Sequence, residues 1–251
     1  MRLLLALLCL IPVSALADYP DPERKQVQVE ILTGTLIAAP GQVVVTGSST
    51  IGRWRSIRKD LLPAEVIATG LPGSNMNDLD HYLDELVLRY RPRAVVIYQG
   101  DNDLLIEGVS VEQVVDRFRH IVTRTKAALP DVSIYVLSIK PRLSRRDKWA
   151  EATAINRAFG AMAERIDGLR YVDMVKPMLD DNGLPRRDLF VEDGVHLSAG
   201  GYRLWSSILR PILWCDHRMD SGRFGQDRRY AARLCAEENG SSASSMPAGT
   251  E

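Results

Sequence analysis

Apolar and polar positions along this chain follow two periods, which predict strands and helices in alternation. Short apolar runs bounded by glycine, proline or polar residues are typical of buried strands. We expect five strands, at residues 43–46, 65–69, 94–99, 132–139 and 169–172. Longer segments between them carry apolar residues at helical spacing, which indicates helices that bury one face. We expect these helices at residues 77–90, from the capping box of Ser110 and Gln113 to Pro130, at 149–166, and from Ser198 onward.

The order of these elements predicts the fold class. Strands that alternate with helices form mostly parallel sheets covered on both faces. We therefore expect an α/β protein, a three-layer α/β/α sandwich with a mostly parallel five-stranded sheet. A chain of 251 residues with 45% hydrophobic residues suits one such domain. Because ligands bind at the carboxyl ends of the strands in these sheets, residues directly after the predicted strands are candidates for chemistry.

The first residues are typical of a secretory signal peptide. A basic start at Met1-Arg2 precedes an apolar run from Leu3 to Leu10, and Ala15-Leu16-Ala17 is a small-x-small cleavage site. The apolar run is too short to cross a bilayer. We expect cleavage after Ala17 and a periplasmic or secreted protein without a stable membrane anchor.

The remaining chain divides by composition. Residues 18–40 form a lead-in with a short apolar segment, and residues 41–213 carry the predicted sheet and its helices. Residues 214–235 form a C-terminal extension. Residues 236–251 are small and polar, so we expect them to be a disordered tail.

The charge balance of the chain bears on its binding partners. Lys plus Arg and Asp plus Glu each number 32, so nothing indicates a nucleic-acid partner. A basic stretch within residues 142–148 is typical of a solvated loop.

The three cysteines indicate at most one disulfide bond. Cys9 leaves with the signal peptide, and Cys215 and Cys235 can pair in an exported protein, which would tie the extension to the last helix. Neither has the neighbouring CxxC or HxxxH pattern of a zinc site.

An acid and a histidine near the chain end provide the strongest functional signal. Asp193 lies three positions before His196, just ahead of the last predicted helix. Far upstream, Ser49 follows the first predicted strand in the block Gly47-Ser48-Ser49-Thr50. A nucleophilic serine needs a base to take its proton, and the base needs an acid to hold its tautomer. The serine block is not a GxSxG elbow, since Ile51 stands in place of the second glycine.

Four short blocks together resemble the SGNH hydrolases, also called the GDSL esterase/lipase family. They are residues 47–50, 70–74, 100–103 and 193–196, and the resemblance covers roughly residues 41–213. It implies a flavodoxin-like SGNH hydrolase fold that needs no metal and no cofactor. Carried over by position, the nucleophile is Ser49, the base His196 and the acid Asp193. The implied oxyanion hole comprises the backbone N–H groups of Ser49 and Gly73 and the side-chain amide of Asn102.

One position departs from the family pattern. Ser48 stands where the family usually has an aspartate, which leaves two adjacent serines, and the register favours Ser49 as nucleophile. Asp101 and Asp103 flank Asn102. We expect them to accept hydrogen bonds from backbone N–H groups of their turn, because this block lacks the further acidic ligands of a metal site. The other histidines, His81, His120 and His217, are expected to be structural or exposed.

The resemblance implies an exported serine ester hydrolase acting on carboxylic esters with short acyl or acetyl groups. Alternatives on the same triad are a lysophospholipase- or thioesterase-like lipid hydrolase and a polysaccharide O-acetyl transferase or esterase. A noncatalytic carbohydrate-binding module is the alternative of another class, against which the intact set of Ser49, Asn102, Asp193 and His196 argues. The substrate is thus a small-molecule ester, a lipid or an acetylated carbohydrate, and the oligomeric state stays open.

Overall fold

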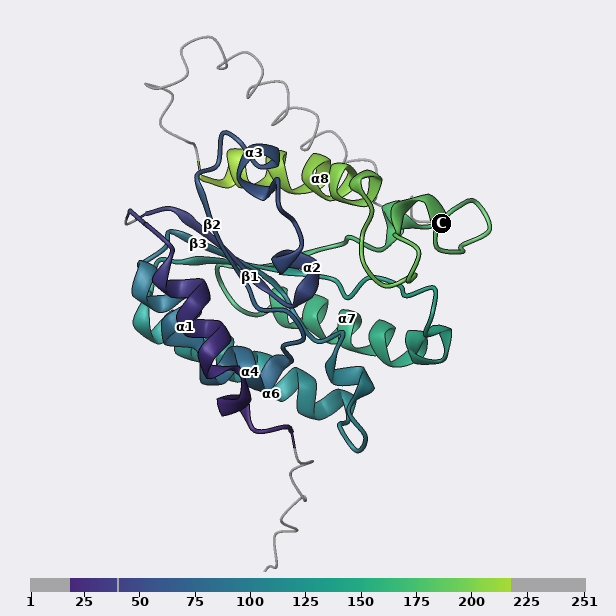
Figure 1. Ribbon diagram of the computed structural model, residues 1–251, viewed down its shortest axis with the longest axis horizontal. Helices are drawn as coiled ribbons and strands as arrows, with labels where there is room; N and C mark the ends of the chain where they lie inside the picture. The colour runs from purple at the N-terminus through teal and green to yellow at the C-terminus, as the bar shows by residue number, and fades with distance from the viewer. Residues whose placement is uncertain (1–18, 40, 218–251) are drawn as a thin grey trace, which may run out of the picture.

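The computed structural model describes residues 19–39 and 41–217 and has three layers (Figure 1). Its central sheet has five parallel strands in the order β2-β1-β3-β4-β5. The strands are β1 (Val43–Gly47), β2 (Val66–Gly70), β3 (Ala94–Tyr98), β4 (Ser133–Leu137) and β5 (Leu169–Val172). The predicted fold class and all five predicted strands are confirmed, with strand ends that differ by at most two residues.

Helices cover both faces of the sheet. The α-helices are α1 (Gln26–Gly34), α2 (Ser49–Gly52), α3 (Ile57–Asp60), α4 (Met76–His81), α5 (Leu83–Leu86), α6 (Val111–Ala128), α7 (Trp149–Ala163) and α8 (Ala199–His217). Short 3-10 turns are η1 (Pro22–Lys25), η2 (Leu88–Tyr90), η3 (Asp103–Leu105), η4 (Arg146–Lys148), η5 (Lys176–Met178) and η6 (Arg187–Leu189). Figure 1 shows α3 and α8 on one face and α1, α4, α6 and α7 on the other. None of the helices in the described ranges is both long and apolar enough to cross a membrane.

Each strand contributes to two hydrophobic cores. Successive strand residues point to opposite faces. Val44 and Val95 pack with α4 to α7, whereas Val43 and Val96 pack with α3 and α8. A parallel strand buried on both sides needs an unbroken apolar run, which is why these strands were visible in the sequence.

The helix expected at residues 77–90 is broken into α4, α5 and η2. At Tyr82 the backbone leaves the helical conformation (φ −96°, ψ 25°), and the Tyr82 hydroxyl donates to the Pro22 carbonyl oxygen at 3.0 Å. Leu79, Leu83 and Leu86 all remain buried. Because the apolar spacing continues through the break, the pattern alone predicted one helix.

The segment before residue 41 packs on the body of the fold. Arg24 of η1 forms two hydrogen bonds with the fully buried carboxylate of Asp78, at 2.5 and 2.7 Å. Asp78 also belongs to the capping box that starts α4, with Asn75 as its partner. Val29 of α1 belongs to the hydrophobic core that also contains residues of α4 to α7. The expected lead-in is therefore a structured part of the protein over the residues described.

The carboxyl end of β1 turns sharply into α2. Gly47 has φ +148°, and a Cβ atom there would lie 2.0 Å from the Tyr98 carbonyl oxygen. Only glycine lets β1 approach β3 this closely. The chain then continues through Ser48 to Ser49, the first residue of α2. The sequence-predicted nucleophile thus stands at the sheet edge where ligands bind in folds of this class.

Candidate active site

Ser49, His196 and Asp193 form a hydrogen-bonded chain. Ser49 Oγ lies 2.9 Å from His196 Nε2, although the two residues are 147 positions apart. His196 Nδ1 lies 2.6 Å from Asp193 Oδ2. With Nδ1 facing the carboxylate, Nε2 is free to accept a proton from the serine hydroxyl. The structure brings together the three residues expected from the sequence.

The Asp193 carboxylate is held by its own turn. Its Oδ1 accepts the backbone N–H groups of Val195 and His196, at 2.8 and 2.9 Å, while Oδ2 faces the imidazole. Burial raises the pKa of Asp193, but the hydrogen bonds from the His196 ring and the two backbone amides outweigh it and hold the pKa well below its usual range. Asp193 is therefore ionised at neutral pH and orients the imidazole.

Helix α8, which follows His196, also fixes the turn that carries Ser49. The Tyr202 hydroxyl donates to the Thr50 carbonyl oxygen at 2.9 Å. The Tyr202 ring stacks on Trp54, with centroids 5.2 Å apart. The histidine loop and the serine turn are thereby braced against the same helix.

The expected oxyanion donors have available N–H groups. In the part of the chain that the structure describes, the Ser49 and Gly73 amides donate to no protein acceptor. Gly73 has φ +70°, a conformation that favours glycine. Asn102 Nδ2 donates to the Ser74 carbonyl oxygen at 2.8 Å, and Asn102 Oδ1 accepts from Arg142 Nη2 at 3.0 Å. An amide nitrogen has two hydrogens, so one remains for a substrate oxygen.

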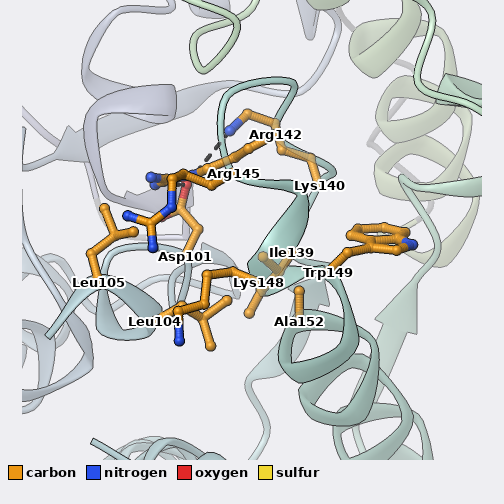
Figure 2. Close-up of a pocket in the computed structure, with 10 residues that line it drawn as sticks. All are labelled: Asp101, Leu104, Leu105, Ile139, Lys140, Arg142, Arg145, Lys148, Trp149 and Ala152. Carbon is orange, nitrogen blue, oxygen red and sulfur yellow. Dashed lines mark ion pairs between the residues drawn. The ribbon is translucent and has the colours of Figure 1, made fainter. Parts of the chain in front are cut away.

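Asp101 has a different role from the one expected. Instead of capping its own turn, the buried carboxylate accepts from Ser48 Oγ at 3.2 Å and from the Tyr98 hydroxyl at 3.0 Å. It also pairs with Arg142 at 2.9 Å and Lys140 at 3.5 Å, the two cations that Figure 2 shows converging on it. Burial raises its pKa, and the two cations more than compensate, lowering it to about 2. Burial also lowers the pKa of Lys140, to about 8.

The basic loop after β4 is therefore not wholly solvated. The Arg142 side chain is 10% exposed and that of Lys140 is fully buried, whereas the Arg145 side chain is 41% exposed. The prediction of a solvated loop was wrong for Arg142, and Lys140 was not recognised as part of the site. One available signal was their place directly after a buried strand, at the same sheet edge as Asp101.

Asp103 supports a neighbouring helix. Both of its carboxylate oxygens accept the Met76 N–H at the start of α4, at 3.0 and 3.1 Å, so the expectation that it serves its own turn was incomplete. Burial raises the pKa of Asp103 to about 7. Within residues 19–39 and 41–217, no group of three or more His, Cys, Asp or Glu side chains is placed to hold a metal ion.

The remaining candidates lie apart from this network. His120 pairs with Asp80 and is 56% exposed, and His81 packs edge-on against Tyr82. The side chain of His217 lies outside the described residues, as does Cys235. Cys215 is disulfide-bonded, and its pairing with Cys235 stays a prediction.

Comparison with known proteins agrees with this geometry. The model of the GDSL-like Lipase/Acylhydrolase family matches residues 37–204. No curated protein matches the chain significantly. Similar solved structures include a GDSL-like lipase from Bacteroides thetaiotaomicron, with TM-score 0.62 and 18% identity over 77% of this chain and 97% of that one. A carbohydrate esterase family 3 protein from Talaromyces cellulolyticus has TM-score 0.55 and 20% identity over 69% and 96%.

A third similar structure is a catalytic mutant of an acetylxylan esterase from Geobacillus stearothermophilus, with TM-score 0.56 and 17% identity over 69% of this chain and 94% of that one. At such identities the structures show a shared fold. The family model, which spans about two thirds of the chain, shows more: the chain belongs to the GDSL-like lipase/acylhydrolase family of ester hydrolases.

Proposed function

We propose that the protein is an exported serine esterase that cleaves short-acyl or acetyl carboxylic esters with Ser49, His196 and Asp193. The observation that carries this proposal is the continuous chain from Ser49 Oγ through the imidazole to the Asp193 carboxylate. Each link is within hydrogen-bonding distance without a bound substrate. That arrangement suits acyl transfer to a serine hydroxyl.

The proposed reaction has two halves. Ser49 Oγ attacks the ester carbonyl carbon while His196 Nε2 takes the hydroxyl proton. His196 then returns this proton to the leaving alkoxide as the carbon–oxygen bond breaks, which releases the alcohol and leaves an acyl-Ser49 ester. A water molecule repeats the sequence with the same base and releases the carboxylic acid and free Ser49. Asp193 stabilises the imidazolium in both halves.

The oxyanion of each tetrahedral intermediate needs donors that are fixed before reaction. We assign this role to the N–H groups of Ser49 and Gly73, which donate to no acceptor among the described residues, and to the second amide hydrogen of Asn102. Asn102 suits the role because a neutral amide donates without a charge of its own to desolvate.

The cavity beside Arg142 is a candidate site for the alcohol portion of the substrate, because Arg142 contacts Asn102. This cavity has a volume of about 110 Å³ and also touches Trp149 and Arg146. Its remaining lining is Pro141, Leu179, Gly183, Leu184 and Pro185. Ser49, Gly73 and His196 are not among the residues that line it, so its volume does not define the acyl length, but its two arginines favour a polar alcohol portion of the substrate. The described esterases of similar fold add acetylated carbohydrates to the candidates.

Export is proposed from the leader sequence alone. The basic start, the apolar run and the Ala15-Leu16-Ala17 site indicate cleavage after Ala17. N-terminal sequencing of protein recovered from periplasm and medium tests this, and a mature chain beginning at Met1 would contradict it.

The decisive experiment measures kcat/KM for p-nitrophenyl esters from C2 to C16, together with acetylated sugars. We expect a maximum between acetyl and butyryl, and loss of activity in Ser49→Ala. A maximum at C8 or longer would favour a lipid hydrolase instead. Acyl transfer to an added sugar at the expense of hydrolysis would indicate a transferase, and no turnover with no labelling by a fluorophosphonate would indicate a binding module.

A further inference from the structure

We propose that Arg142 is a positioning residue that holds the Asn102 amide in the orientation needed for oxyanion binding, with Asp101 as its anchor. This inference rests on the proposed function, since it concerns one of its oxyanion donors. Arg142 is assigned no contact with the substrate.

A single nitrogen of Arg142 bridges two adjacent residues of the site. Arg142 Nη2 lies 3.0 Å from Asn102 Oδ1 and 2.9 Å from Asp101 Oδ2. A guanidinium group only donates hydrogen bonds, so it can bond the oxygen of the amide, which accepts, and cannot bond the amide NH₂, which donates. The Ser74 carbonyl oxygen only accepts, and it takes Asn102 Nδ2 at 2.8 Å. Both partners therefore select the same orientation of the amide.

The opposite orientation would disable the oxyanion site. A flipped Asn102 would place N–H groups against Arg142 and its carbonyl oxygen against the Ser74 carbonyl. It would then offer an acceptor in place of the second amide hydrogen. Because a developing oxyanion needs a donor fixed in advance, the guanidinium influences catalysis through Asn102.

Arg142 is itself held firmly. Its side chain is 10% exposed and pairs with the buried, ionised carboxylate of Asp101. The start of its loop is fixed by Asn156 of α7, which accepts from the Ile139 N–H at 2.7 Å and donates to the Ile139 carbonyl at 3.0 Å. Figure 2 shows the Lys140 and Arg142 side chains reaching from this loop toward Asp101.

The same loop reaches the catalytic acid turn. The Leu143 N–H donates to the Gly194 carbonyl oxygen at 2.8 Å. Gly194 directly follows Asp193. A loop tied at one end to α7 and at the other to the acid turn provides a rigid base for Arg142, and rigid support is what a preorganised donor requires.

A double-mutant cycle tests this role. The variants are Arg142→Met, Asn102→Ala and both together, assayed with neutral p-nitrophenyl acetate and, for comparison, with an anionic ester. We expect Arg142→Met to lower kcat about 10- to 100-fold with little change in KM, and Asn102→Ala to lower it about 10²- to 10³-fold. Because Arg142 acts through Asn102, the double variant should be no slower than Asn102→Ala.

Arg145→Met is the matched control. Arg145 lies in the same loop, is 41% exposed and pairs with Asp147, so its removal should leave kcat unchanged. Arg142→Lys keeps a cation beside Asp101 and should retain more activity than Arg142→Met. If Arg142→Met does not fold, the cycle is run with Arg142→Lys.

Each of the following results would contradict a different claim about Arg142, Asn102 or Ser49. Multiplicative losses in the double variant would overturn the positioning role and indicate a separate function of Arg142. A rise in KM confined to anionic esters would overturn it in favour of direct substrate binding. An unchanged kcat in Asn102→Ala would overturn the oxyanion role of Asn102, and with it this inference. Failure of the proposed function as a whole would appear separately, as full activity in Ser49→Ala.

A second inference has independent support at Gly73. We infer that Lys25, in the segment before the matched family region, positions and polarises the other oxyanion peptide. Lys25 Nζ donates to the Pro72 carbonyl oxygen at 2.8 Å and lies 3.2 Å from Gln28 Oε1. The Pro72 carbonyl and the Gly73 N–H belong to one peptide unit and point in opposite directions in a trans peptide. The Lys25 ammonium bound to the Pro72 carbonyl oxygen therefore fixes this peptide unit and strengthens the Gly73 N–H as a hydrogen-bond donor.

Replacing Lys25 with methionine tests this inference. We expect kcat for neutral esters to fall about 2- to 7-fold with unchanged KM, which corresponds to weakening one oxyanion donor by 10–30%. Lys59→Met, at an exposed position of α3, is the control and should show wild-type kinetics. An unchanged kcat in Lys25→Met would overturn the inference, and an effect on KM limited to anionic esters would assign Lys25 to substrate binding.

Discussion

Ser48 and Ser49 are adjacent, yet the structure predicts opposite consequences for their replacement by alanine. Ser49 Oγ faces His196 Nε2 at 2.9 Å in a partly buried site. Ser48 is fully buried and donates to Asp101 Oδ1 at 3.2 Å. One variant should lose activity and keep its stability, and the other should lose stability and keep its activity.

For Ser49→Ala, the expected loss of kcat is about 10⁴- to 10⁶-fold, because the nucleophile is gone and only binding and oxyanion stabilisation remain. The free energy of unfolding should change by less than about 1 kcal/mol. His196 loses one neighbour but remains hydrogen-bonded to Asp193.

For Ser48→Ala, the ionised Asp101 loses one donor but keeps Tyr98, Arg142 and Lys140. A hydrogen bond to a charged group contributes about 1.5–3 kcal/mol, and the 3.2 Å length places this one near about 1.5 kcal/mol. For a protein of this size, that corresponds to a fall in Tm of about 3–6 °C. We expect kcat/KM within about tenfold of wild type, since the loss at Asp101 reaches the oxyanion site only indirectly.

The assay pairs urea unfolding at pH 7 with hydrolysis of p-nitrophenyl acetate by the same preparations. Mass spectrometry of fluorophosphonate-labelled protein identifies the reactive serine directly. An inactive Ser48→Ala beside an active Ser49→Ala would refute the assignment of the nucleophile. Wild-type stability in Ser48→Ala would refute the reasoning about the buried hydrogen bond to Asp101.

Three further predictions follow from the contacts described. His196→Ala should reduce kcat as severely as loss of the nucleophile, and Asp193→Ala should reduce it less, since the imidazole remains present; equal activity of wild type and His196→Ala at neutral pH would contradict the triad. Because burial raises the pKa of Asp103 to about 7, the native state keeps a proton there that the unfolded chain releases above about pH 4. The free energy of unfolding should therefore fall as pH rises from about 4 to 7, and Asp103→Asn should flatten this slope in urea titrations. Arg24→Met leaves the buried Asp78 carboxylate without its bidentate partner and should cost about 3 kcal/mol in urea unfolding; a change under about 0.5 kcal/mol would show that the pair contributes little.

Much of the fold could be predicted because its determinants are local. The β3 run Ala-Val-Val-Ile-Tyr at 94–98 is buried on both faces, so its composition identifies it without reference to its neighbours. The capping box of Ser110 and Gln113 marks the start of α6 by the same local chemistry that forms it. The break at Tyr82 escaped prediction because the apolar spacing continues through it; the contact that the structure shows there is a distant one, the Tyr82 hydroxyl bound to the Pro22 carbonyl 60 residues earlier.

The candidate site likewise contains residues that a local sequence pattern identifies and residues that only the tertiary structure places there. Asp193 and His196 were found because three residues separate them and their turn fixes their contact. Ser49 was found because a polar block follows a buried strand. Lys140 was not recognised as part of the site, and Arg142 was expected in solvent, since a basic stretch is usually exposed. Their burial depends on a carboxylate that the sheet brings alongside from the end of another strand, and no local pattern encodes that.

The departure at Ser48 also has a physical interpretation within this network. Asp101 is the carboxylate against which both Lys140 and Arg142 pair, and Ser48 supports it as a neutral donor at 3.2 Å. An aspartate at this position, as the family resemblance implies, would place a second carboxylate beside Asp101, and two like charges at that distance repel by about 5 kcal/mol at an effective dielectric constant near 20. With Ser48 in place, Asp101 keeps its charge and can anchor Arg142. The substitution next to the nucleophile therefore bears on how Asn102 is held, through Asp101 and Arg142, and leaves the contact of Ser49 with its base unaltered.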